Sequence, residues 1–199
     1  TNRLMTLGAG VSFSSGKYGL ELKLDGSQNE NGATWGNTSI NGLAGSYEAT
    51  WLLVMTVLQG GRLFAQWDGY YQNWLIDNES GTDLIWVASD DAAGNRVRFD
   101  GTSVFSLDGS LHSLVCTWRG GTNHNIIVNG RVKSTTVVNS AIGNGIQGDP
   151  GDQIRFGQTA TSGTASKCGI LFAAIWNRGF SESEAIDLSI NPYKSEERR

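Results

Sequence analysis

Three charged residues at alternate positions are the nearest approach to a catalytic pair in this sequence. Glu21, Lys23 and Asp25 belong to the segment Glu21-Leu-Lys-Leu-Asp25, and alternate residues of a strand point to the same face. Glycoside hydrolases use two carboxylates that flank the scissile bond. Lys23 stands where a second acid would be needed, so we interpret the segment as a solvated strand face and predict that the chain is not an enzyme.

An aromatic segment between Trp67 and Asp77 is the best candidate for ligand binding. Flat aromatic rings pack against the apolar faces of sugars, and neighbouring polar side chains orient the hydroxyls. Tyr70 and Tyr71 are adjacent, so in a strand they cannot both point inward, and we expect at least one exposed ring. The alternative is that these rings pack in a core or an interface. The candidate glycan-binding residues are Tyr70, Tyr71, Asn73, Trp74 and Asp77.

A loop that contains Asp149 and Asp152 around Pro150-Gly151 is the first choice for a metal site. Calcium takes carboxylate and carbonyl oxygens from such loops. Asp90-Asp91 and Asp77-Asn78 are further candidates, but none of these pairs has a diagnostic spacing. Asp residues in Gly-rich loops commonly form turns. We therefore expect no cofactor, with Ca²⁺ at Asp149 and Asp152 as the alternative.

The two histidines and two cysteines do not form a recognisable site. His112 and His124 fit neither a catalytic triad nor a metal-ligand spacing, and we interpret His112 as structural. Cys116 and Cys168 both lie inside apolar strand patterns, where a free thiol behaves as a small hydrophobe. We expect free thiols, with a disulfide as the alternative, because no secretory route is indicated.

The elements that must position these residues are nearly all short strands. The chain has 199 residues, with 27 Gly and 2 Pro, which suits one domain with many tight turns. One helix is expected after Ser181, where Ser181 and Glu184 form a capping box, and it should dock through Ile186 and Ile190. The expected strands are 11–14, 18–24, 47–58, 62–67, 74–76, 84–88, 96–99, 103–106, 111–118, 125–128, 131–137, 153–156 and 169–176.

Two segments carry a resemblance to a known family. The first, 111–136, has a strand, a Gly120-Gly121 turn, a strand, an Asn129-Gly130 turn and a third strand. The second, 168–188, has an apolar strand and the capped helix. Together they resemble the concanavalin A-like jelly rolls of the laminin-G-like group, although Leu111 replaces a common Trp and Asn129 a common Asp. The resemblance implies one all-β domain over 1–199, an antiparallel two-sheet jelly-roll sandwich with one short C-terminal helix and short terminal extensions.

The resemblance also gives three function hypotheses. The closing residues Ser181 to Tyr193 resemble bacteriophage versions of the domain, which implies a non-enzymatic virion structural protein, a capsid decoration or fibre-type surface component that could also bind host glycans. A free carbohydrate-binding lectin module is the alternative. A glycoside hydrolase or lyase is the third hypothesis, and the missing acid pair disfavours it.

Charge and the chain ends define the expected partners. Charged residues make up 17% of the chain and its net charge is −4. The chain therefore lacks the excess of positive charge that binding to nucleic acid or to an acidic membrane would need. The longest apolar run, 49–58, is about half of the roughly 20 residues that span a bilayer, and we expect a buried strand there.

No secretory signal opens the sequence, so we expect synthesis in the host cytoplasm and a place on the virion surface. Expected partners are major capsid or tail proteins, host glycans and further copies of the chain. Segment 1–7 could add as a strand to a neighbour, and the expected anchoring residues are Thr1, Asn2, Arg3, Lys194, Arg198 and Arg199.

Overall fold

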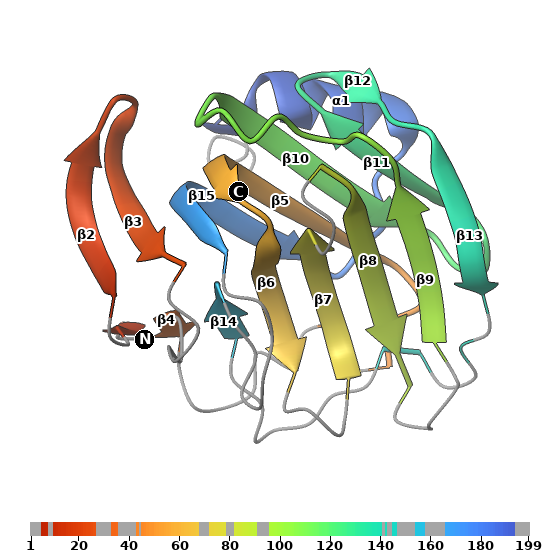
Figure 1. The fold of residues 1–199 in the computed structure, drawn as a ribbon. Helices are drawn as coiled ribbons and strands as arrows, with labels where there is room; N and C mark the ends of the chain where they lie inside the picture. The colour runs from red at the N-terminus through yellow and green to blue at the C-terminus, as the bar shows by residue number, and fades with distance from the viewer. Residues whose placement is uncertain are drawn as a thin grey trace.

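The described part of the chain folds into two facing antiparallel sheets with one helix on the outside (Figure 1). The computed structural model describes residues 5–7, 10–26, 33–35, 43, 45–67, 72–78, 82–90, 96–140, 142, 145–146, 154–157 and 166–193. Among these residues, no helix is long and apolar enough to cross a membrane. The architecture confirms the expected all-β, two-sheet sandwich with one short C-terminal helix.

One sheet has eight described strands and the other has seven. In spatial order, the eight-stranded sheet consists of β1 (Met5–Leu7), β4 (Ala33–Trp35), β14 (Ile154–Phe156), β6 (Gly61–Trp67), β7 (Gln72–Asn78), β8 (Leu84–Ser89), β9 (Arg96–Gly101) and β13 (Thr135–Ser140). The seven-stranded sheet consists of β12 (Arg131–Val132), β11 (His124–Val128), β10 (Leu111–Trp118), β5 (Ala49–Gln59), β15 (Lys167–Trp176), β3 (Gly19–Asp25) and β2 (Val11–Gly16).

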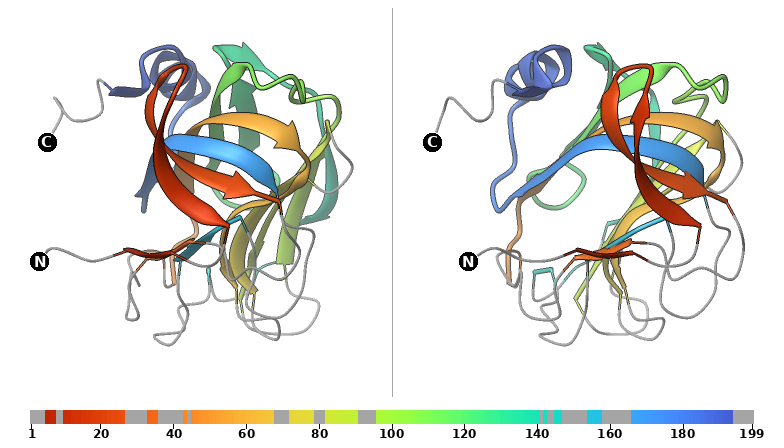
Figure 2. Two further views of the ribbon diagram at one scale, coloured as in Figure 1. Left: turned by 60° about the vertical axis from the view of Figure 1, so that its left-hand side comes forward. Right: turned by 90° about the vertical axis from the view of Figure 1, so that its left-hand side faces the viewer.

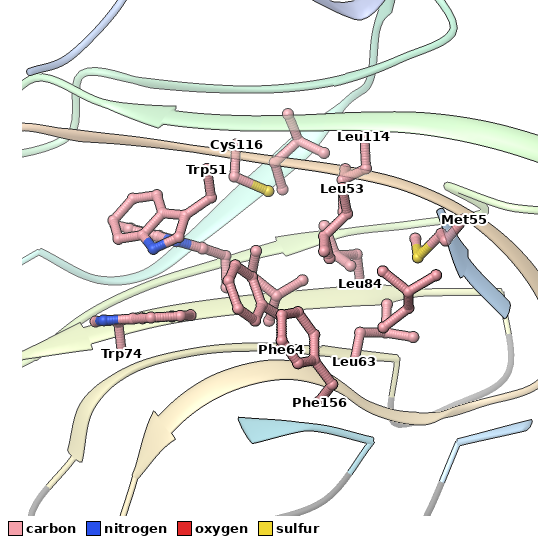
Figure 3. Packing of buried hydrophobic residues seen from close by; sticks show 14 of the residues in the cluster. Trp51, Leu53, Met55, Leu63, Phe64, Trp74, Leu84, Leu114, Cys116 and Phe156 are labelled. Atoms are coloured by element: carbon pink, nitrogen blue, oxygen red, sulfur yellow. The ribbon is translucent and has the colours of Figure 1, made fainter. Parts of the chain in front are cut away.

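Large apolar side chains fill the space between the two sheets (Figure 3). Trp51, on central strand β5, lies with its ring centroid 5.0 Å from that of Trp86 and 5.8 Å from that of Trp74, both on the opposite sheet. All three rings are at most 2% exposed. Since alternate residues of β5 point inward, Leu53 and Met55 continue the same core, and the intervening residues face outward.

Helix α1 (Glu182–Ile190) begins at the predicted capping box. The Glu184 backbone N–H donates to Ser181 Oγ at 3.3 Å, and the Ser181 N–H donates to Glu184 Oε2 at 2.8 Å. These hydrogen bonds satisfy two N–H groups that a helix start leaves without intrahelical partners.

The helix packs on the outer face of the seven-stranded sheet, through a face different from the one expected. Its buried residues are Ala185, Leu188 and Ser189, a stripe at i, i+3 and i+4. Ile186 is partly buried, but Ile190 follows this stripe by one residue, is rotated away from the sheet and is 60% exposed. The prediction that Ile190 anchors the helix is therefore wrong.

The strand predictions hold best where turns are encoded locally. Asn129 and Gly130 have positive φ angles of 51° and 76°, as a two-residue hairpin turn of type I′ requires. The segment expected as one strand, 131–137, divides into β12 and β13, which belong to different sheets. Segment 103–106 is not a strand: Ser103 has φ 52°, and its N–H donates to Asp83 Oδ1 at 2.8 Å.

The short strand β4 was not predicted from the sequence, and β1 lies in the segment that was expected to add as a strand to a neighbouring molecule. They pair with each other, Met5 opposite Trp35 and Leu7 opposite Ala33. Residues 5–7 of the expected anchoring segment 1–7 thus pair within their own chain.

Candidate binding groove

The structure separates two residues of the expected aromatic site. Trp74 is 0% exposed and points into the core, where its Nε1–H donates to Gln66 Oε1 at 3.1 Å (Figure 3). Asp77 is 5% exposed and forms an ion pair with Arg62 Nε at 2.5 Å. Residues three apart on a strand face opposite sides of the sheet. The prediction that Trp74 and Asp77 contact one sugar is therefore wrong.

Apart from Asn73, the remaining predicted site residues lie outside what the structure describes, and all of them stay predictions. Asn73 belongs to β7, but its side chain is not described. Within the described ranges, no group of three or more His, Cys, Asp or Glu side chains could hold a metal ion. The residues outside these ranges are Tyr70, Tyr71, Asp149, Asp152, Thr1, Asn2, Arg3, Lys194, Arg198 and Arg199.

His112 and the two cysteines are buried, as expected. His112 is 6% exposed, packs edge-on against Phe105, and its Nε2 lies 3.1 Å from Ser106 O. Cys116 and Cys168 are free thiols. Burial raises the pKa of Cys168 to about 12, and the nearby negative charge of Glu21 adds to the rise. A thiol with so high a pKa is not a nucleophile at neutral pH.

A groove of about 700 Å³ lies on the outer face of the seven-stranded sheet. Its lining residues come mainly from the β2–β3 hairpin and from strands β15 and β5. The hairpin bends away from the rest of the sheet (Figure 2). We call it the Glu21 groove. The side chains that define it are Ser12, Tyr18, Glu21, Lys23, Thr56 and Lys167, around the backbone of Gly169.

Glu21 is buried in this groove, although it lies on an outward-facing strand face. Its exposed fraction is 6%, whereas Lys23 and Asp25 on the same face are exposed. Two glycines make room for it, because a Cβ added at Gly16 or at Gly169 would overlap the Glu21 carboxylate. The interpretation of the whole face as solvated is therefore wrong at Glu21. Its burial depends on Gly169, which is far away in sequence and could not be paired with Glu21 from a local pattern.

The Glu21 carboxylate has unused hydrogen-bonding capacity. Among the described residues its ion-pair partner is Lys23, with Nζ 3.4 Å from Oε1, longer than a direct charge-assisted hydrogen bond. An ionised carboxylate offers about four acceptor sites, and buried polar groups are nearly always hydrogen-bonded. Ser14, opposite Glu21 on β2, has a buried Oγ without a partner in the described part of the chain. The groove floor therefore presents acceptor sites that a ligand can use.

The strand register places hydroxyl and ammonium groups beside this carboxylate. Ser12, Lys23, Gly169 and Thr56 are consecutive partners across β2, β3, β15 and β5. Thr56 Oγ1 accepts a hydrogen bond from the Gly169 N–H at 3.2 Å, so its O–H remains a donor. At the rim, the Tyr18 ring is 36% exposed, with Lys17 Nζ 5.0 Å from its centroid.

Comparison with known proteins gives a likeness of fold. No protein-family model matches the chain, and no curated protein matches its sequence. The binding domain of botulinum neurotoxin serotype G matches with a TM-score of 0.64 at 20% identity, over 94% of this chain and 46% of that chain. The binding domain of Paraclostridial Mosquitocidal Protein 1 matches with a TM-score of 0.67 at 15% identity, over 96% and 48%. This chain therefore spans about half the length of those two chains.

A third match covers most of both chains. It is domain 4 of an extracellular arabinanase from Geobacillus stearothermophilus, in complex with arabinotriose, with a TM-score of 0.64 at 16% identity, over 94% of this chain and 87% of that chain. The chain shares its fold with these domains. The expected antiparallel two-sheet sandwich is thus confirmed at the level of fold.

Proposed function

We propose that this chain is a non-catalytic glycan-binding module and that its ligand lies in the Glu21 groove. The observation that carries the proposal is the buried Glu21 carboxylate, which faces the groove with unused acceptor sites. Sugar hydroxyls are hydrogen-bond donors that a carboxylate accepts in pairs, and a buried site strengthens each such bond. Two of the similar structures are binding domains, one of a botulinum neurotoxin and one of a mosquitocidal protein, and a third is in complex with arabinotriose, which supports this class of function.

The groove supplies the groups that orient a sugar. Glu21 accepts from two neighbouring hydroxyls, while Thr56 and Ser12 contribute hydroxyls from either side. Lys23 and Lys167 donate to ring or carbonyl oxygens of the ligand. The exposed Tyr18 ring offers an apolar surface for a sugar face at the rim.

The spacing of the acids supports a role without catalysis. Glu21 and Asp25 are four residues apart on β3, with Lys23 between them on the same face. Glycosidases place two carboxyl groups on either side of the scissile bond. Lys23 stands between the two acids and pairs with Glu21. The groove can bind through one carboxylate, and Lys23 occupies the place of a second acid next to it.

Glycan-array screening followed by calorimetry tests the proposal. Hydrogen bonds to charged groups contribute about 1.5–3 kcal/mol, so Glu21→Gln should weaken binding roughly 10- to 100-fold while it preserves the side-chain shape. Glu182→Gln, on helix α1 outside the groove, is the matched control and should bind as the wild type does. Equal affinity of the wild type and Glu21→Gln for a glycan on the array would overturn the proposed site.

A second candidate function is the expected role as a virion surface component, in several copies and in contact with capsid or tail proteins. It is favoured by edge strand β2, which ends the seven-stranded sheet among the described strands and has the uncharged sequence VSFSSG. Its Phe13 side chain is 53% exposed. Edges without charges are suited to pairing with another chain. Fixed stoichiometry on purified phage particles would support this role, and absence from the particles would remove it.

A further inference from the structure

A second cavity of about 550 Å³ lies on the same face of the seven-stranded sheet. It is formed where helix α1 ends above β5 and β10, and we call it the helix-end cavity. The residues that define it are Val54, Leu111, Ser113, Asn129, Ile190 and Tyr193.

The helix-end cavity adjoins the Glu21 groove through strand register. Leu111 of the cavity is the direct cross-strand partner of Thr56 in the groove. Val54 and Thr56 are alternate residues of β5 and therefore share its outward face. The row from Ser12 through Lys23, Gly169 and Thr56 thus continues to Leu111 and crosses five neighbouring strands. At a spacing of 4.7–4.9 Å per strand, the row is about 19 Å long.

The helix-end cavity combines apolar and polar groups. Tyr193 is 57% exposed and is held by an edge contact with Phe172, with ring centroids 5.7 Å apart. Ser113 is only 8% exposed, and its Oγ has no hydrogen-bond partner within the described residues. An exposed ring beside a buried, unpartnered hydroxyl provides one surface for a sugar face and one group for a sugar hydroxyl.

We infer that the Glu21 groove and the helix-end cavity form one continuous binding groove that accommodates an internal stretch of a polysaccharide. The inference rests on the proposed glycan-binding function and deepens it. Glu21 holds one sugar near the hairpin, and Tyr193 and Ser113 hold another several units further along the same chain. The ligand class is a linear polymer bound along its length, as opposed to a single terminal sugar.

This arrangement makes affinity depend on ligand length. A mono- or disaccharide fills only the Glu21 groove, whereas a longer oligosaccharide also covers Leu111 and reaches Tyr193. Each added contact increases the buried apolar surface. Affinity should therefore rise until the oligosaccharide reaches the Tyr193 ring and then level off.

Calorimetry with length series tests the inference. The probes are arabinan, mannan, β-glucan and alginate oligosaccharides from one to six units, titrated into wild type, Glu21→Gln, Tyr193→Ala and Tyr193→Phe. In the series that binds, we expect Tyr193→Ala to weaken the hexamer at least about fivefold and to leave the disaccharide unchanged. Tyr193→Phe, which keeps the ring, should bind as the wild type does. Tyr47→Ala is the control for loss of a similarly exposed tyrosine, since Tyr47 is 49% exposed and belongs to neither cavity.

The outcomes separate the inference from the proposed function. Affinity that levels off at one or two units, with an effect of Glu21→Gln but none of Tyr193→Ala, overturns the continuous groove and leaves the glycan-binding function standing. Binding in none of the four series counts against both. A length-dependent gain that Tyr193→Ala abolishes supports the continuous groove.

Discussion

The backbone of Gly169 on β15 lies directly against the side-chain carboxylate of Glu21 on β3. A Cβ at Gly169 would overlap that carboxylate and would lie 2.9 Å from Thr56 Oγ1. The space that glycine leaves between these two side chains is what allows an acid on the sheet surface to be buried. Gly169 thus shapes the groove floor without contributing a side chain.

Replacement of Gly169 by Ala should disturb both binding and stability. The added methyl forces the Glu21 carboxylate to move, and overpacking of this kind costs about 1–3 kcal/mol. We expect a lower midpoint in urea unfolding and weaker glycan binding. In the double variant Glu21→Ala/Gly169→Ala the overlap is gone, so its loss of stability should be smaller than the sum of the two single losses. Additive losses would show that the two residues are not in contact.

Replacement of Trp74 by Ala should destabilise the protein through loss of core packing. Removal of a buried tryptophan costs about 3–5 kcal/mol, measured as the free energy of unfolding in urea. Tyr193→Ala, at a ring that is 57% exposed, is the comparison and should change this free energy little. A Trp74→Ala protein of normal stability that loses glycan binding would restore the sequence-based hypothesis of a sugar contact at Trp74.

Replacement of Ser181 by Ala should weaken the start of helix α1. The Ser181 side chain accepts from the Glu184 N–H, and loss of such a cap costs about 1 kcal/mol. The expected result is a small fall in melting temperature. Ser134→Ala, at an exposed serine between β12 and β13, is the matched control. Equal destabilisation by both substitutions would argue against the capping role.

The pH dependence of stability should contain a contribution from Asp108. Its carboxylate accepts hydrogen bonds from Ser110 and Ser106, which lower its pKa to about 2. In the unfolded chain the pKa of Asp is about 3.9. Because the folded pKa is depressed, this stabilisation is present above about pH 3.9 and is lost as the pH falls through about 2. Asp108→Asn should be less stable than wild type at pH 6, and their unfolding free energies should converge near pH 2. A constant difference across this range would contradict the prediction.

Local sequence patterns were sufficient for the elements whose turns are encoded nearby. The Asn129-Gly130 turn and the Ser181 capping box both occur where the sequence predicts them, because a few adjacent residues determine their geometry. Segment 131–137 has a continuous strand pattern, and nothing within it shows that the chain passes from one sheet to the other between Val132 and Thr135.

The candidate groove could not be predicted from local patterns, because it is formed by residues that are far apart in the sequence. Glu21 has the alternation of a solvated face, and only the approach of Gly169 makes it buried. Trp74 was expected to contact a sugar, because an aromatic residue next to polar residues in the sequence is typical of a sugar-binding surface. In the structure its side chain is buried. Its inward direction follows from the pairing of β7 with β6 and β8, which places it against Trp51 and Phe64.

The position of β15 between β5 and β3 has a consequence for the order of folding. Strand β15 ends at Trp176, so a growing chain makes the β2–β3 hairpin long before the strand that joins it to the rest of the sheet. Pairings of such long sequence separation are slow to form. During that interval the edges of β5 and β3 that later pair with β15 are open to other chains. Chains truncated before Lys167 should therefore aggregate on expression, and completion of β15 during synthesis should mark the point at which the protein becomes soluble.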